Sequence, residues 1–193
     1  MSTVQVIPYS ERWPHEFRHV AATLRDVLGD LAVRIDHIGS TSVPGLAAKD
    51  VLDIQVAVAS LDIERLLEPF SRAGFELVAR NDRDHIPEGS SASDDGWRKI
   101  FFRPSASRRR VHVHVRIASA PNARYALLFR DYLREHLGAA AAYAELKRKL
   151  AALEPPLDVG VYADVKDPAC DIIIAAAEDW AAQVGWKPGA SDG

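Results

Sequence analysis

Two apolar segments joined by a small polar turn constrain the fold of this chain more than any other feature. Residues 31–38 alternate apolar and charged side chains, which is typical of a short strand, and four small residues follow at 39–42. Residues 51–59 form the next expected strand, with branched apolar side chains on one face and Asp53 on the other. The pattern therefore predicts a sheet in which an exposed turn lies close to an acidic strand.

The turn and Asp53 together predict phosphate chemistry. Backbone N–H groups in a turn of small residues can hold an anion, and a carboxylate on the next strand can hold the metal that neutralises it. Gln55 occupies the same-face position two residues later, where a second carboxylate would complete such a site, and Asp50 belongs to the opposite face. The alternative is that Asp53 is a buried structural carboxylate that accepts hydrogen bonds from the turn.

A second constellation lies in residues 111–117, where branched apolar residues alternate strictly with polar ones. His112, His114 and Arg116 share one face of this expected strand. Two histidines at this spacing are adjacent candidate metal ligands, and an arginine supplies a fixed positive charge for phosphate. The alternative is an ordinary solvated face, since no third histidine or cysteine is supplied locally.

Composition narrows the class of protein. The chain has 193 residues, 48% of them hydrophobic, and a formal charge of −3, which gives no overall basic field for duplex binding. Its one cysteine, Cys170, excludes an internal disulfide and fits a buried structural thiol. The N-terminal residues lack signal-peptide features, and no apolar run approaches the roughly 20 residues of a membrane span. We expect a cytoplasmic protein that does not bind membranes.

The order of the expected elements predicts an α+β protein, a single domain over residues 1–193. A sheet-rich part covers residues 1–118, three helices fill 119–184, and the tail 185–193 is expected to fray. On the helices, Tyr162 and Lys166 stand one turn apart and could reach the polar face of the sheet. Arg130, Arg134 and Lys147 are candidates for the same role, although all five positions also suit structural roles.

The segment 80–96 is polar and long, which is typical of a functional loop. Basic residues crowd this loop and the expected hairpin after it, and they could clamp a polyphosphate or contact an RNA backbone. The basic residues of this set are Arg80, Arg83, His85, Arg98, Lys99, Arg103, Arg108, Arg109 and Arg110. Few aromatic residues are interleaved with them, so RNA stacking has weak support and a solvated face is the alternative.

One long motif resembles a known family. The run His37-Ile38-Gly39-Ser40-Thr41-Ser42-Val43-Pro44-Gly45-Leu46-Ala47-Ala48-Lys49, followed by Asp53-Ile54, is similar to the signature of the GrpB (UPF0157) family. This uncharacterised group also occurs fused to some dephospho-CoA kinases, as a C-terminal domain. Further matching segments are Phe101-Phe102-Arg103, residues 111–115, 129–134 and 143–147, and Tyr162 with Lys166. The resemblance extends from about Val4 to Trp180.

The family looks like a branch of the nucleotidyltransferase superfamily, which implies a mixed β-sheet with flanking helices and a helical C-terminal half. It also implies a Gly-Ser turn at Gly39, an acidic metal-binding strand at Asp53 and a third ligand on the strand of His112 and His114. The superfamily's second acidic position falls on Gln55. Asp50 stands where relatives commonly have proline.

These observations and the resemblance lead to one leading hypothesis about function. Asp53, His112 and His114 are expected to act in catalysis and to hold Mg²⁺ or another divalent metal. The residues expected to bind phosphate or ligand are Gly39, Ser40, Thr41, Ser42, Lys49, Arg98, Arg116, Tyr162 and Lys166. We expect a protein that binds a nucleotide or phosphorylated small molecule and transfers a nucleotidyl group. The alternative is a binding or accessory protein for nucleotide, coenzyme or RNA on a degenerate scaffold, with a link to coenzyme A biosynthesis.

Overall fold

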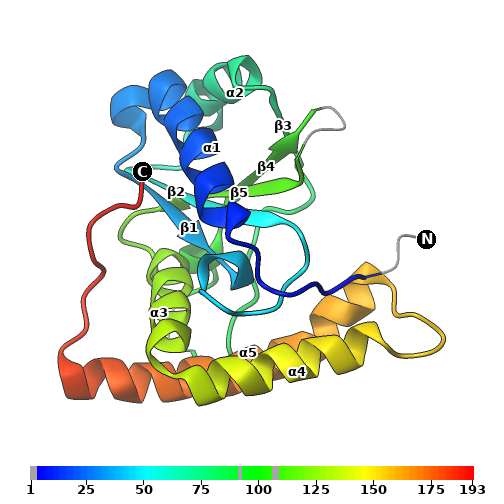
Figure 1. Ribbon diagram of the computed structural model, residues 1–193. Helices are drawn as coiled ribbons and strands as arrows, with labels where there is room; N and C mark the ends of the chain where they lie inside the picture. Colours follow the sequence, from blue (N-terminus) through cyan, green and yellow to red (C-terminus); the bar gives the residue numbers. More distant parts are fainter. Residues whose placement is uncertain (1–3, 91–92, 106–108) are drawn as a thin grey trace.

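A five-stranded mixed sheet forms the centre of the computed structural model, which describes residues 4–90, 93–105 and 109–193 (Figure 1). The strand order is β1-β2-β5-β4-β3, with β2 and β5 parallel and the other neighbouring pairs antiparallel. The strands are β1 Arg34–Ile38, β2 Leu52–Val58, β3 Phe75–Leu77, β4 Ile100–Pro104 and β5 Val111–Ile117. The expected strands are confirmed, with ends shortened by a few residues.

Two helices, α1 (Arg12–Leu28) and α2 (Ile63–Arg72), cover the apolar face of the sheet (Figure 1). The alternation that placed Leu52, Ile54 and Val56 on one side of β2 buries all three completely against this layer. Phe17 and Leu24 of α1 belong to the same cluster. Burial of this many apolar side chains fixes the sheet's orientation, because a slip of one residue would turn them outward.

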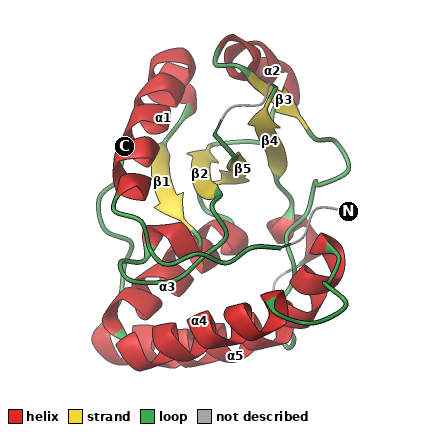
Figure 2. Ribbon diagram, turned by 45° about the vertical axis from the view of Figure 1, so that its right-hand side comes forward, coloured by secondary structure: helices red, strands yellow, loops and turns green. Residues whose placement is uncertain are grey.

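The helical C-terminal half lies across the opposite side, and Figure 2 shows α4 and α5 side by side below the sheet. Its helices are α3 Pro121–Glu135, α4 Leu137–Ala151 and α5 Val159–Val184. A separate apolar cluster joins the segment after β1 to these helices through Leu46, Leu133, Tyr143 and the buried Cys170. The expected α+β class is confirmed, and the polar face of the sheet points toward the helical half.

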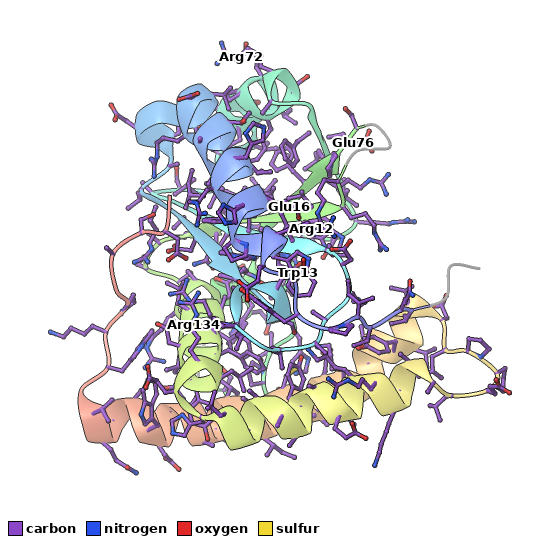
Figure 3. The ribbon with its side chains drawn as sticks, in the orientation of Figure 1. Arg12, Trp13, Glu16, Arg72, Glu76 and Arg134 are labelled. Carbon is purple, nitrogen blue, oxygen red and sulfur yellow. The ribbon has the colours of Figure 1, made fainter. Side chains whose placement is uncertain are left out.

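Arginine and lysine side chains of the helices fasten the segment between β1 and β2. Arg134 of α3 (Figure 3) donates from Nη2 to the carbonyl oxygen of Ser42 at 2.8 Å. Lys147 of α4 donates to the carbonyl oxygen of Ala47 at 2.7 Å. These bonds satisfy carbonyls that a loop would otherwise bury without a partner, so the segment is held rigidly between the two halves.

The tail at 185–193 is an exception to the expectation from sequence. Its last four residues, 190–193, lie along the outer edge of β1, where the N–H of Gly193 donates to the carbonyl oxygen of Ile35 at 3.0 Å. The Asp192 carboxylate accepts from the N–H of His37 at 3.0 Å and from Arg130 at 2.6 Å. The tail therefore covers backbone groups that an edge strand would leave exposed.

Within the described part of the chain, no helix is both long and apolar enough to cross a membrane.

Candidate functional site

The turn after β1 brings its backbone against the acidic strand. Gly39 has φ +67° and ψ −172°, a conformation that is essentially restricted to glycine. A Cβ atom at this position would lie 2.5 Å from Asp53 Oδ2, so the turn also needs the missing side chain for space. Next to it, the ring of His37 shares a 2.9 Å hydrogen bond with the Thr41 hydroxyl. The expected proximity of turn and carboxylate is thus present in the structure.

Asp53, His112 and His114 converge because β2 and β5 are parallel neighbours in a register that pairs Asp53 with His112. The Nδ1 atom of His112 lies 3.3 Å from Asp53 Oδ1, and the Nε2 atom of His114 lies 3.8 Å from the same oxygen. One ligand atom from each side chain falls within 4.8 Å of the others. This arrangement could hold one metal ion, and the Asp53 side chain is 31% exposed.

Burial and neighbouring charges determine the pKa values of Asp53 and His114. Burial raises the pKa of Asp53, but its contacts with His112 and His114 outweigh that effect and hold the pKa well below the ordinary value. Burial lowers the pKa of His114 to about 4, although the contact with Asp53 opposes this. At neutral pH the group is therefore a carboxylate facing a neutral buried imidazole.

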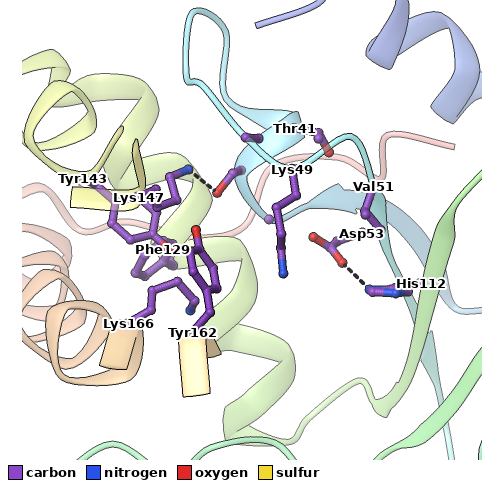
Figure 4. Close-up of a pocket in the computed structure, with 13 residues that line it drawn as sticks. Thr41, Lys49, Val51, Asp53, His112, Phe129, Tyr143, Lys147, Tyr162 and Lys166 are labelled. Carbon is purple, nitrogen blue, oxygen red and sulfur yellow. Dashed lines mark hydrogen bonds and ion pairs between the residues drawn. The ribbon is translucent and has the colours of Figure 1, made fainter. Parts of the chain in front are cut away.

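A cavity of about 240 Å³ opens beside Asp53 toward the helical half, and Figure 4 shows the side chains around it. Three lysines line it: Lys49 from the segment before β2, Lys147 from α4 and Lys166 from α5. Lys147 Nζ donates to Ser40 Oγ at 2.8 Å, and the Ser40 hydroxyl also interacts with Tyr143. The wall of this cavity carries several donors, and Asp53 is its one carboxylate among the residues that the structure describes.

Burial affects the lysines differently. Burial, together with the positive charges of Lys166 and Lys49, lowers the pKa of Lys147 to about 7. Burial also lowers the pKa of Lys49, although the charge of Asp53 opposes this. Burial lowers the pKa of Lys166 too, but Cys170 and Asp167 outweigh it, and the net effect is a raised pKa. When protonated, these lysines repel one another, and an anion in the cavity would relieve that repulsion and favour the protonated form of Lys147.

Tyr162 supplies an additional polar group. Its ring is buried, and the centroid of the ring lies 5.1 Å from Lys49 Nζ. Its hydroxyl has no hydrogen-bond partner among the described residues. A buried hydroxyl without a partner is costly, so such a group in a cavity wall points to a ligand or water that completes its bonding.

A second cavity, of about 250 Å³, adjoins the first and shares Gly39, Asp53, Phe129 and Lys166 with it. Asp84 lies in its wall and comes from the polar loop that the sequence marked as functional. Its carboxylate accepts hydrogen bonds from Arg116, Lys99 and Asn122 at 2.7 to 3.0 Å. Burial raises the pKa of Asp84, but the Arg116 charge outweighs it and holds the pKa well below the usual range. Sequence reasoning missed this residue, and only its place in the long loop signalled it.

The structure brings most of the predicted site residues together, but three of them take other positions. Ser42 is buried and donates back to the carbonyl oxygen of Gly39 at 2.6 Å. Arg116 is buried against Asp84 and faces the second cavity. Arg98 is exposed and lines a different hollow. The predicted residues that line the first cavity are Gly39, Ser40, Thr41, Lys49, Asp53, His112, Tyr162 and Lys166. His114 completes the cluster with Asp53 and His112 and lines the second cavity.

Gln55 and Asp50 cannot supply the second carboxylate of a two-metal site. Gln55 is fully buried, accepts from Arg116 at 2.8 Å and donates to the carbonyl oxygen of Ala123 at 3.2 Å. Asp50 lies on the far side, as the alternation predicts, where it accepts from Trp13 and Arg109 at 2.7 Å each. Both side chains therefore have structural partners away from the cavity.

The basic run in the loop and hairpin is largely paired with carboxylates. Glu16 and Glu76 (Figure 3) lie 2.7 Å from Arg109 and 3.1 Å from Arg103. Other pairs among the described residues include Arg83 with Asp94, His85 with Asp171, Lys99 with Asp84 and Arg109 with Asp50. Arg108 lies outside the described residues. This pairing reduces the positive charge that an RNA backbone would meet.

Comparison with known proteins identifies relatives along most of the chain. A family model described as GrpB protein matches residues 3–176. UPF0157 protein SCO7215 of Streptomyces coelicolor is 37% identical over 168 residues, which is 86% of this chain and 78% of that protein. The crystal structure of the conserved protein GrpB from Enterococcus faecalis superposes with a TM-score of 0.74 at 30% identity, over 91% of this chain and 99% of that one.

Other relatives are longer than this chain. A dephospho-CoA kinase of Mycolicibacterium paratuberculosis is 34% identical over 198 residues, covering 96% of this chain and 48% of the kinase. The chain thus spans about half the length of the curated relatives of this kind that it matches. A fainter likeness is to a cytoplasmic RNA terminal U-transferase, with a TM-score of 0.45 at 15% identity over 73% of this chain and 38% of that one. That likeness does not bear on activity.

Proposed function

The chain belongs to the GrpB family, and we propose that its lysine-lined cavity binds a nucleotide or another phosphorylated small molecule. The observation that carries this proposal is the convergence of Lys49, Lys147 and Lys166 on one cavity beside the Gly39–Ser40 turn. Phosphate groups carry several negative charges and acceptor oxygens, and this wall supplies matching cations and donors.

Each side chain has a distinct role in the proposed complex. Ser40 and Tyr162 both line the cavity, and the Tyr162 hydroxyl, which has no partner among the described residues, donates to a phosphate oxygen. Lys49 and Lys166 offset the phosphate charge. Lys147 already bonds Ser40 and Ala47, so it positions the turn and adds charge.

The reaction class that we propose is nucleotidyl transfer on a scaffold of nucleotidyltransferase type. Two adjoining cavities share Asp53, which provides room for a phosphorylated donor and for an acceptor on either side of it. In such a transfer an acceptor oxygen attacks the α-phosphorus and the bond to the pyrophosphate oxygen breaks. The lysines would stabilise the charge on the departing pyrophosphate, and the cavity walls would orient the two substrates.

A binding module without turnover is the second candidate, and Gln55 favours it. This residue stands where the superfamily has its second acidic position, and its amide is buried with partners of its own. A binding module would hold its ligand in the presence of a chelator and release no pyrophosphate.

Isothermal titration tests the binding proposal with a panel of nucleoside triphosphates, dephospho-CoA, inorganic triphosphate and a nucleoside that lacks phosphate. We expect the phosphorylated compounds to bind and the nucleoside to bind at least roughly tenfold more weakly, since each charge-assisted bond contributes about 1.5 to 3 kcal/mol. Lys49→Ala and Lys166→Ala should each weaken binding by about tenfold or more.

Lys149→Ala is the matched control for these variants. Its side chain is 75% exposed on α4 and lies outside the cavity wall, so binding should be unchanged. Equal affinity of phosphorylated and unphosphorylated compounds, or no binding at all, would contradict the proposal. Pyrophosphate release measured on the same samples separates transfer from binding alone.

A further inference from the structure

The imidazole of His114 lies between two carboxylates. On one side its Nε2 atom is 3.8 Å from Asp53 Oδ1, and on the other its Nδ1 atom is 4.0 Å from Asp84 Oδ1. The Nδ1 atom is buried and has no hydrogen-bond partner among the described residues. Both ring nitrogens therefore face negative charge.

A neutral imidazole has one N–H group, so it can satisfy only one of these carboxylates. Asp84 is held in place by Arg116 and Lys99, and a metal ion bound at Nε2 would leave the ring proton on Nδ1, facing this carboxylate. The lone pair of Nε2 then points toward Asp53. A lone pair and a carboxylate oxygen facing one another repel, and a cation between them removes the repulsion.

The ligand atoms that these residues offer also indicate which cation the site would bind. Mg²⁺, which the superfamily resemblance implies, prefers six oxygen ligands in an octahedron. This site offers one carboxylate and two imidazoles, and the neighbouring amide of Gln55 is engaged elsewhere. Imidazole nitrogen suits zinc and the later first-row transition metals, so the residues present do not fit Mg²⁺ well.

We propose that Asp53, His112 and His114 bind one first-row transition-metal ion of the zinc type in preference to Mg²⁺, and that Asp84 is the positioning residue for His114. In the proposed metal-bound protein, the Asp84 carboxylate, 4.0 Å from Nδ1, stabilises the tautomer and the ring orientation that direct Nε2 to the metal. Carboxylates behind metal-bound histidines have this role in many metal sites. The metal site adjoins the proposed phosphate cavity, but it is argued from different residues.

Metal titration of untagged protein in the absence of any nucleotide tests the proposal. We expect one equivalent of Zn²⁺ to bind roughly 100-fold or more tightly than Mg²⁺. Co²⁺ should give visible absorption bands that Zn²⁺ abolishes. His112→Ala and His114→Ala should each remove the Co²⁺ bands. His112 is 37% exposed, so its removal should leave the fold intact. Preference for Mg²⁺, or no binding of Zn²⁺ or Co²⁺ by the wild-type protein, would overturn the metal assignment.

Asp84→Asn tests the positioning role, and we expect Zn²⁺ to bind about 10- to 100-fold more weakly. Asp82→Asn is the matched control, because this exposed carboxylate lies two residues away in the same loop and should leave affinity unchanged. Asp84→Glu keeps the charge beside Arg116 and Lys99 if the asparagine variant does not fold. Wild-type Zn²⁺ affinity in a folded Asp84 variant overturns the positioning role. Since no nucleotide is present, these outcomes are separate from those for phosphate binding.

Discussion

Gly39→Ala is expected to destabilise the protein and to abolish binding of phosphorylated ligands. The backbone at this position has φ +67°, which costs a residue with a side chain on the order of 1 to 3 kcal/mol. The added Cβ would also lie 2.5 Å from Asp53 Oδ2 and 2.9 Å from Asp53 Cβ, so the carboxylate or the turn must move. We expect ligand affinity to fall by about 100-fold or more, because a shift of the turn would move Ser40 and the bond from Lys147 that it accepts out of place in the cavity wall.

Gly45→Ala is the matched control for this substitution. Gly45 also has a positive φ, +77°, but a Cβ there would meet no atom within 4 Å. Its variant should therefore carry the backbone cost alone and should bind ligand as the wild-type protein does. Denaturant unfolding and isothermal titration of both variants make the comparison. If the two variants bind ligand equally well, the close approach of Gly39 to Asp53 does not matter for the site.

The second large effect concerns Lys147 and pH. Burial lowers the pKa of this lysine to about 7 in the free protein, and a bound phosphate would raise it again. The affinity for inorganic triphosphate should then be highest below pH 7 and should decline as the pH rises above 7, because binding requires a proton that the free protein has lost. We expect a decline of roughly tenfold between pH 6 and pH 9, equivalent to about 1.4 kcal/mol.

Lys147→Met removes the titrating group and should weaken binding at pH 6 by about tenfold or more. The ratio of wild-type to variant affinity cancels the titration of triphosphate itself, so this ratio should be large at pH 6 and approach a lower constant value above pH 8. Lys149→Ala, on the exposed side of the same helix, should reproduce the wild-type profile. A ratio that does not change with pH would show that Lys147 does not exchange its proton on binding.

Sequence periodicity predicted the elements that carry the site. Alternation placed His112 and His114 on one face of β5 and Asp53 on the polar face of β2, and all three do lie there. The pattern did not reveal that β2 and β5 are parallel neighbours, because pairing depends on contacts between distant parts of the chain. Their proximity in the metal-capable cluster was expected from the family resemblance alone.

Residues in irregular segments were harder to predict. Asp84 lies in a loop without periodicity, so its bonds with Arg116 and Lys99 could not be read from spacing. Arg98 and Arg116 were both predicted to bind phosphate, because the sequence shows their charge but not the residues that they contact in the fold. The tail was expected to fray because it lies at a chain terminus, whereas Asp192 has a partner in Arg130, far away in the sequence. In each case the missing information was the partner of a polar group.

The central claim is that the lysine-lined cavity holds phosphate groups beside Asp53. A crystal structure of the protein with saturating inorganic triphosphate tests it most directly. We predict phosphate density in contact with the hydroxyl of Ser40 and with Lys49, Lys147 and Lys166. Triphosphate bound only elsewhere on the molecule, with this cavity free of it at saturation, would contradict the claim.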